Sequence, residues 1–124
     1  MAHSSPIYDP AQAITGSCSA DIAGGLLVKV AAAKTDGNPV SIAIAGASDS
    51  AIGVVAEDAK SGDLVPVYTA GHVLSVTAGG TVTAGSAVEV MAGGKVQDLA
   101  SGKKVGVAFT GGSANDSVLV QIQF

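Results

Sequence analysis

The sequence predicts an all-β protein, a small antiparallel β-barrel or sandwich with an extended N-terminal arm. Three observations support this class. Glycine turns recur every eight to ten residues along most of the chain, apolar residues alternate with small or polar ones, and no long stretch has a helical period. Short strands joined by glycine turns are typical of antiparallel barrels and sandwiches.

The first hairpin is the clearest element. A strand is expected at residues 26–30, a turn at Asp36-Gly37, and a return strand at residues 40–45. Asp-Gly favours a hairpin because both residues tolerate a positive φ. On the return strand, Val, Ile and Ile alternate with Ser, Ala and Ala, so one face is apolar and the other is small. Further strands are expected at residues 51–55, 64–68, 72–77, 81–83, 87–91, 95–99 and 118–124.

One pattern of strand, acidic turn and strand occurs twice. A shift of 53 positions aligns the two copies without a gap: Gly53, Val54, Asp63, Val65 and Val67 fall on Gly106, Val107, Asp116, Val118 and Val120. A shift of 23 positions also aligns several Gly and Val residues of the region 62–79 with the region 85–102. Chance matches between Gly and Val are common in such short strands, so the 23-residue shift leaves true duplication open.

Pro66 lies inside the strand expected at residues 64–68. Proline cannot donate a hydrogen bond to a neighbouring strand. This strand is therefore expected either at a sheet edge or with the proline nitrogen pointing outward, away from a neighbouring strand. Val65, Pro66 and Val67 are therefore a candidate edge for contact with a neighbouring subunit.

Residues 1–20 are predicted to precede the folded part, residues 21–124. The segment contains Pro6, Pro10 and Gly16 and has no sustained strand or helix period. It also contains Ile7 and Tyr8, which make it less polar than an idle tail. Two interpretations stay open: a frayed terminus, or an arm that becomes ordered on the surface of a partner.

Composition argues against several classes of partner. The formal net charge is −4 and the six basic residues are scattered lysines, so no basic patch for nucleic acid is expected. No apolar run is long enough for a membrane span, and the first residues lack the pattern of a signal peptide, so we expect a soluble protein that is not secreted by that route. The single cysteine excludes a disulfide within the chain.

A search for reactive groups yields no catalytic, metal or cofactor site. His72 is expected at a strand start as a solvated or hydrogen-bonded residue, and Cys18 is interpreted as a small apolar residue. Glu57, Asp58 and Asp63 suggest a calcium loop, but the alternating oxygen ligands of such a loop are absent, which favours a solvated turn. The glycine-lysine pairs lack the rest of a phosphate-binding loop. No small-molecule substrate is predicted.

Several segments occur in a fixed order: Pro-Ile-Tyr-Asp-Pro at 6–10, Ala-Gly-Gly at 23–25 before Leu-Val at 27–28, Ile-Gly-Val-Val-Ala-Glu-Asp-Ala at 52–59, Gly-Asp-Leu-Val-Pro-Val at 62–67, and Val-Gly-Val-Ala at 105–108 before Val-Leu-Val at 118–120. Together they resemble the capsid decoration proteins, or head cement proteins, of tailed bacteriophages. The similarity covers nearly the whole chain.

This resemblance implies a β-tulip-like domain that assembles as a homotrimer on the outside of the expanded phage head and is made in the cytoplasm of the host bacterium. It implies the major capsid protein as partner, clamped by the N-terminal arm. Carried onto this sequence, the arm contacts are Pro6, Ile7, Tyr8 and Pro10. The resemblance implies a structural protein, not an enzyme, that stabilises the capsid lattice.

A binding module for carbohydrate or a cell surface is the alternative function, since β-sandwiches also carry such sites. Sugar sites usually present exposed aromatic rings, and only Tyr8 and Tyr68 are candidates. An enzyme is the third hypothesis, for which no pair of nucleophile and base can be named.

Overall fold

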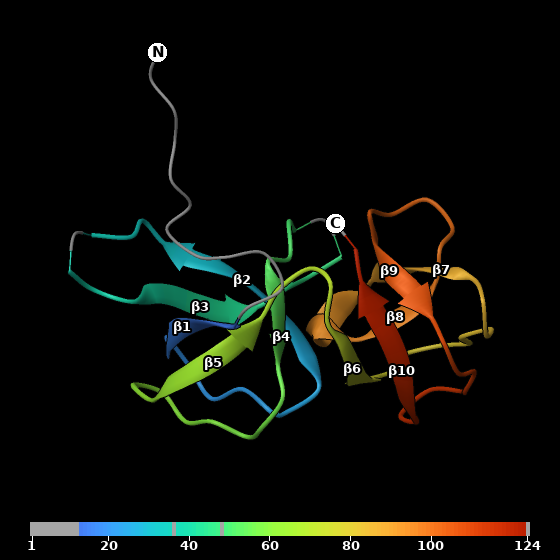
Figure 1. The fold of residues 1–124 in the computed structure, drawn as a ribbon, viewed down its shortest axis with the longest axis horizontal. Coiled ribbons are helices and arrows are strands. Elements are labelled where there is room, and N and C mark those ends of the chain that lie inside the picture. Colours follow the sequence, from blue (N-terminus) through green and yellow to red (C-terminus); the bar gives the residue numbers. More distant parts are fainter. Residues whose placement is uncertain (1–12, 36, 48, 124) are drawn as a thin grey trace, which may run out of the picture.

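The computed structural model describes residues 13–35, 37–47 and 49–123, and nearly all regular structure in them is β (Figure 1). This confirms the predicted fold class. The elements are β1 (Ala13–Cys18), β2 (Leu26–Ala32), β3 (Val40–Ile44), β4 (Gly53–Val55), β5 (Leu64–Tyr68), β6 (Val73–Thr77), β7 (Ala87–Val90), the short 3-10 turn η1 (Ala92–Gly94), β8 (Val96–Asp98), β9 (Lys104–Ala108) and β10 (Ser117–Ile122).

Strands β1 to β5, residues 13–68, form a closed barrel that we call the first unit. The order around the barrel is β1-β3-β2-β4-β5. β1 pairs in antiparallel fashion with β5 and in parallel with β3. The sequence predicted an antiparallel barrel, and the parallel pair is a difference with a geometric cause. Strand directions cannot alternate all the way around a ring of five, so at least one neighbouring pair must be parallel.

Strands β6 to β10, residues 73–122, form a second sheet that we call the second unit. Its order is β6-β10-β9-β7-β8, and its strand pairs are antiparallel. A single parallel bridge between Ala78 and Val96 joins the two ends of this sheet. Figure 1 shows the two units side by side, with the first coloured blue to green and the second yellow to red.

The second unit repeats the topology of the first, with β6 to β10 in the places of β1 to β5. The turns between β4 and β5 and between β9 and β10 also share their hydrogen bonds. The Asp63 carboxylate accepts a bond of 2.9 Å from the Lys60 amide, and the Asp116 carboxylate accepts one of 2.9 Å from the Ser113 amide. The strand, turn and strand aligned by the 53-residue shift therefore occupy equivalent places in the fold.

The alignment by 23 residues has no such counterpart. It places β5 on β7, and these strands occupy different positions in their units. The strand expected at residues 81–83 is reduced to one bridge, between Val82 and Gly112. The hairpin expected at residues 26–45 is confirmed, since β2 and β3 pair in antiparallel register; Asp36 of its turn lies outside the described residues.

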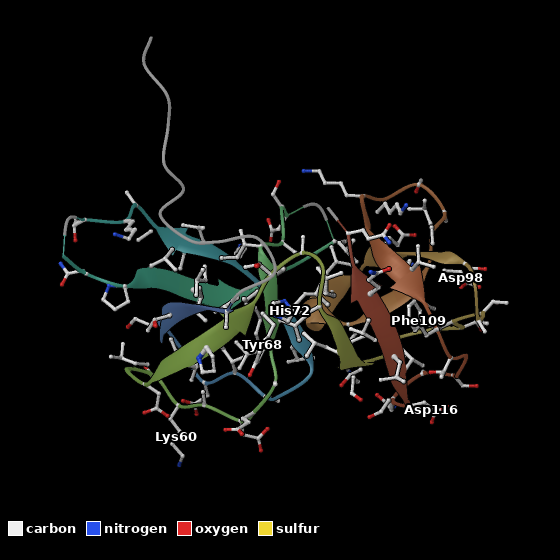
Figure 2. The ribbon with its side chains drawn as sticks, in the orientation of Figure 1. Lys60, Tyr68, His72, Asp98, Phe109 and Asp116 are labelled. Atoms are coloured by element: carbon white, nitrogen blue, oxygen red, sulfur yellow. The ribbon has the colours of Figure 1, made fainter. Side chains whose placement is uncertain are left out.

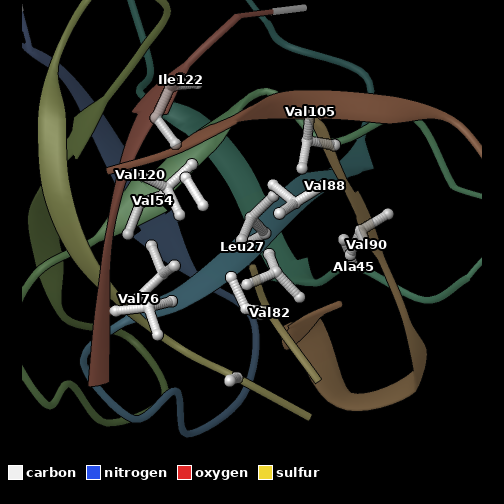
Figure 3. Packing of buried hydrophobic residues seen from close by; sticks show 14 residues of the cluster. Leu27, Ala45, Val54, Val76, Val82, Val88, Val90, Val105, Val120 and Ile122 are labelled. Carbon is white, nitrogen blue, oxygen red and sulfur yellow. The ribbon is translucent and has the colours of Figure 1, made fainter. Parts of the chain in front are cut away.

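Two clusters of buried side chains hold the units together. One fills the barrel of the first unit and includes Val28, Ile42 and Val67. The other fills the second unit, and it also contains Leu27 and Val54 from the first unit (Figure 3). Because neighbouring residues of a strand point to opposite faces, β2 and β4 contribute to both clusters. The wall made by these two strands therefore joins the units through a common core.

Candidate binding surfaces

The predicted arm overlaps the barrel. The four proposed capsid contacts in it, at positions 6, 7, 8 and 10, lie outside the described residues. The boundary at residue 20 is wrong, because Ala13–Cys18 form β1, which closes the barrel between β3 and β5. The barrel thus begins at Ala13 and not after residue 20.

Gly16 explains why sequence patterning missed this strand. A Cβ at Gly16 would lie 2.9 Å from Val67 Cγ2 and 3.0 Å from Ile42 Cδ1, so a larger side chain would crowd the barrel interior. Glycine usually weakens a strand and breaks its apolar alternation, except where another chain segment approaches closely. The close approach is visible only when β3 and β5 are in place.

The predicted edge at Val65, Pro66 and Val67 is also wrong, whereas the other alternative, a missing amide that faces no strand partner, fits the structure. β5 pairs with β1 along its length and with β4 at its end, so it has neighbours on both sides. Val67 is fully buried and Val65 is half-buried, and both pack in the barrel core. Only Pro66 is exposed to solvent among the three.

Pro66 nevertheless marks an opening between β4 and β5. The pairing of these strands ends at Val55 and Val67, before Pro66 is reached. At the equivalent position of the second unit, the amide of Leu119 donates a bond of 2.9 Å to the hydroxyl of Thr110. Proline has no amide hydrogen, so this bond cannot form in the first unit. A hollow of about 90 Å³ lies here, lined by Val55, Ala56, Glu57, Asp58, Val65, Pro66 and Tyr68.

The acidic turn has a structural use. Asp58 accepts a hydrogen bond of 2.8 Å from the Gly24 amide, and Asp21 accepts one of 2.9 Å from the Ser61 amide. These bonds tie the turn between β4 and β5 to the loop between β1 and β2. Glu57, Asp58 and Asp63 are exposed, as expected of a solvated turn. Within the described residues, no group of three His, Cys, Asp or Glu side chains is placed to hold a metal ion.

His72 and Cys18 are held by local contacts. The His72 ring lies edge-on to Tyr68, with ring centroids 5.2 Å apart, and its Nδ1 is 3.0 Å from the Thr69 carbonyl oxygen (Figure 2). This confirms a hydrogen-bonded histidine. Cys18 is buried in the barrel core, which confirms its apolar interpretation, and burial raises the pKa of its thiol, with smaller contributions from Asp63 and Asp21.

One part of the outer surface of the second unit is apolar, a feature the sequence did not suggest. Val118, Val120 and Ile122 of β10 point into the core, so Leu119 points outward. Phe109 lies beside it, and its amide donates a bond of 2.7 Å to the Leu119 carbonyl. We define the outer apolar face as Val73, Ala87, Leu99, Val107, Phe109 and Leu119, all of them exposed or half-buried.

Sequence reasoning missed this face because each strand supplies only one or two of its residues. Leu119 shares the outward side of this segment with Gln121 and Gln123, so that side looked polar in the sequence. The register brings the apolar residues together: Gln121 pairs with Val107 of β9 and Val73 of β6, and Val107 pairs with Ala87 of β7.

The described residues contain no helix long and apolar enough to cross a membrane. Their fold is a β-module with two related units, an apolar outer face and carboxylates engaged in turn hydrogen bonds. These features define the class of the protein as an all-β module of two related units.

The chain belongs to the phage cement protein family, whose sequence profile matches residues 9–122. This match confirms the predicted family and supports a structural role associated with the phage capsid. Comparison with curated proteins found no match.

A solved structure described as the head fiber gp8.5 N base in bacteriophage phi29 is similar in fold, with a TM-score of 0.70 and 17% sequence identity. The alignment covers 90% of this chain and 92% of that one, so the similarity includes both units.

Proposed function

We propose that this protein is a capsid decoration protein that binds the outer surface of the mature phage head as a homotrimer and stabilises the lattice of the major capsid protein. The observation that carries the proposal is the family match over residues 9–122, which includes both units. The fold shared with a phage head fiber base is consistent with it.

Stabilisation requires binding energy and no chemical reaction. A protein that binds the mature lattice but not its precursor shifts the equilibrium toward the mature form by its difference in affinity. A trimer that contacts several capsid subunits binds more tightly than one copy, because the first contact raises the effective concentration of the others. The net charge of −4 suits a protein on the capsid exterior, away from packaged DNA.

The N-terminal segment is proposed as the capsid-binding arm. Residues 1–12 lie before β1, and twelve residues span up to about 40 Å when extended. Pro6, Ile7, Tyr8 and Pro10 would contact the major capsid protein. Apolar and aromatic side chains next to prolines are suited to this use, because proline lowers the conformational entropy lost on binding.

Binding to undecorated, expanded capsids tests the proposed function. Purified protein should cosediment with these capsids and raise their melting temperature. Precursor capsids are the control, and they should bind the protein more weakly. Absence of binding to mature capsids at micromolar protein would refute the proposal.

A deletion tests the arm separately. Because Ala13 already belongs to the barrel, the deletion should remove residues 2–12 only. The truncated protein should melt at an unchanged temperature but lose capsid binding. Tyr8→Ala is the matched point variant and should weaken binding with no effect on folding. If the truncated protein bound capsids as well as the full chain does, the arm would have no role in attachment.

A further inference from the structure

The two units of this protein differ in how one equivalent surface is covered. In the first unit, Leu27, Ala45 and Val54 lie on the outer side of the barrel and are fully buried, because the second unit packs on them. In the second unit, the residues at the same positions are Ala87, Leu99 and Val107. Leu99 is 41% exposed, and the other two are half-buried.

Strand pairing and hydrogen bonds establish that these positions are equivalent. Leu27 of β2 pairs with Val54 of β4, and Ala87 of β7 pairs with Val107 of β9. The Leu27 carbonyl accepts a bond of 3.0 Å from the Ala45 amide. In the same way, the Ala87 carbonyl accepts a bond of 2.9 Å from the Leu99 amide. A surface that is core in one unit is thus open in the other.

The open surface also has the chemistry of an interface. It is extended by Val73, Phe109 and Leu119, which are 44%, 53% and 39% exposed. Figure 2 shows Phe109 beside β10, on the second unit. Ser75 and Gln121 lie among these side chains and are uncharged. Glu89, two residues after Ala87 on β7, and its partner Lys104 on β9 are charged and border the face. A contiguous apolar face with its charged residues at the border marks an interaction site, because the centres of protein interfaces are depleted in charged residues.

We propose that the outer apolar face is covered by a second copy of this chain. The structure favours this occupant because Leu27, Ala45 and Val54, the counterparts of Ala87, Leu99 and Val107, are covered by a β-unit of the same fold and the same chain. The inference rests on the proposed function, in which copies form a trimer, and it names the surface involved. In a ring of three, each copy uses two different surfaces, and the outer apolar face is one of them.

Charged substitutions on the face test this assignment. Leu119→Lys places a charge among its exposed side chains, and Phe109→Ser removes its aromatic ring. Leu64→Lys is the matched control, since Leu64 is a strand residue of the first unit that is 63% exposed. Light scattering and sedimentation should show wild-type protein and Leu64→Lys as oligomers. Leu119→Lys should weaken assembly at least about tenfold, as loss of a central interface side chain does. Melting followed by circular dichroism checks that each variant folds.

Assembly and capsid binding are measured separately, so their failures can be told apart. If wild-type protein is monomeric at all concentrations, or if folded Leu119→Lys and Phe109→Ser assemble normally, the interface is refuted while capsid binding can still stand. If both variants assemble normally but lose capsid binding, the face contacts the capsid protein, which overturns the self-association proposal. If wild-type protein assembles through this face but does not bind capsids, the proposed function fails and the interface stands.

Discussion

Leu27→Ala is the substitution that tests the common core most directly. Leu27 is fully buried at the junction of the units, with Val54 beside it and Val76 and Val120 of the second unit in the same cluster. Truncation of a buried leucine removes apolar contacts and leaves a cavity, which costs about 2 to 5 kcal/mol. The second unit carries Ala87 at the equivalent position, so alanine is compatible with the strand itself. The loss should therefore come from packing between the units.

We expect a loss of about 3 kcal/mol in the free energy of unfolding. For 124 residues, the entropy of unfolding near the midpoint is about 0.26 kcal/mol/K, so the melting temperature should fall by about 12 °C. Urea denaturation and calorimetry measure the two quantities. Leu64→Ala is the control: Leu64 is 63% exposed, and its truncation should change stability by no more than about 0.5 kcal/mol.

The shape of the transition tests the same reasoning. Because one cluster contains side chains of both units, wild-type protein should unfold in a single transition, with equal calorimetric and van't Hoff enthalpies. A loss below about 1 kcal/mol for Leu27→Ala, or two separate transitions in wild-type protein, would show that the units are stabilised independently and would refute the common core.

Three further predictions concern single positions. Gly53→Ala should destabilise the protein by about 1 to 3 kcal/mol, because its Cβ would lie 2.5 Å from a backbone carbonyl oxygen of β5; unchanged urea denaturation would contradict this. The folded-state pKa of Cys18 is raised above 9.0, so its contribution to stability is present at neutral pH and lost as the pH rises through that pKa. Cys18→Ala should reduce the loss of stability above pH 9. If the free energy of unfolding of wild type and Cys18→Ala fell equally with pH in this range, ionisation of Cys18 would not be the cause. The pKa of Asp49 is lowered from 3.8, chiefly by its bond to Lys29, whose Nζ lies 2.9 Å from the carboxylate. The stabilisation from the ionised Asp49 carboxylate is present above the ordinary carboxyl pKa and is lost as the pH falls through the lowered pKa of Asp49. The difference in unfolding free energy between wild type and Asp49→Asn should therefore shrink in acid, and a difference independent of pH would contradict the assignment.

The sequence carried most of the local information in this fold. Strand positions follow from alternation and from turn glycines, since both are properties of neighbouring residues. The 53-residue shift marked equivalent strands because the repeated turn depends on Asp63 and Asp116, each of which binds the amide three residues before it. Such a bond joins residues only three positions apart, so it can be recognised from a local sequence pattern.

Features that depend on distant strands were missed or misjudged. β1 was assigned to the arm, because Gly16 is explained only by contacts with Val67 and Ile42. β5 was expected at an edge, because Pro66 lacks an amide, whereas the barrel closes around it and leaves only a local opening. A closed barrel depends on pairing between its first and last strands, and local periodicity contains no information on that pairing.

The fold class, the repeated turns and the family could be predicted without coordinates, since they depend on residue type, order and spacing. The packing of the strands shows in addition that two similar units share a core. It buries Ala45 and Val54 between the units and leaves Leu99 and Val107, at the equivalent positions, at the surface. The physical reason is that a side chain is buried only when a second surface packs against it. A strand specifies which side chains share a face, but the packing of other strands decides whether that face is covered.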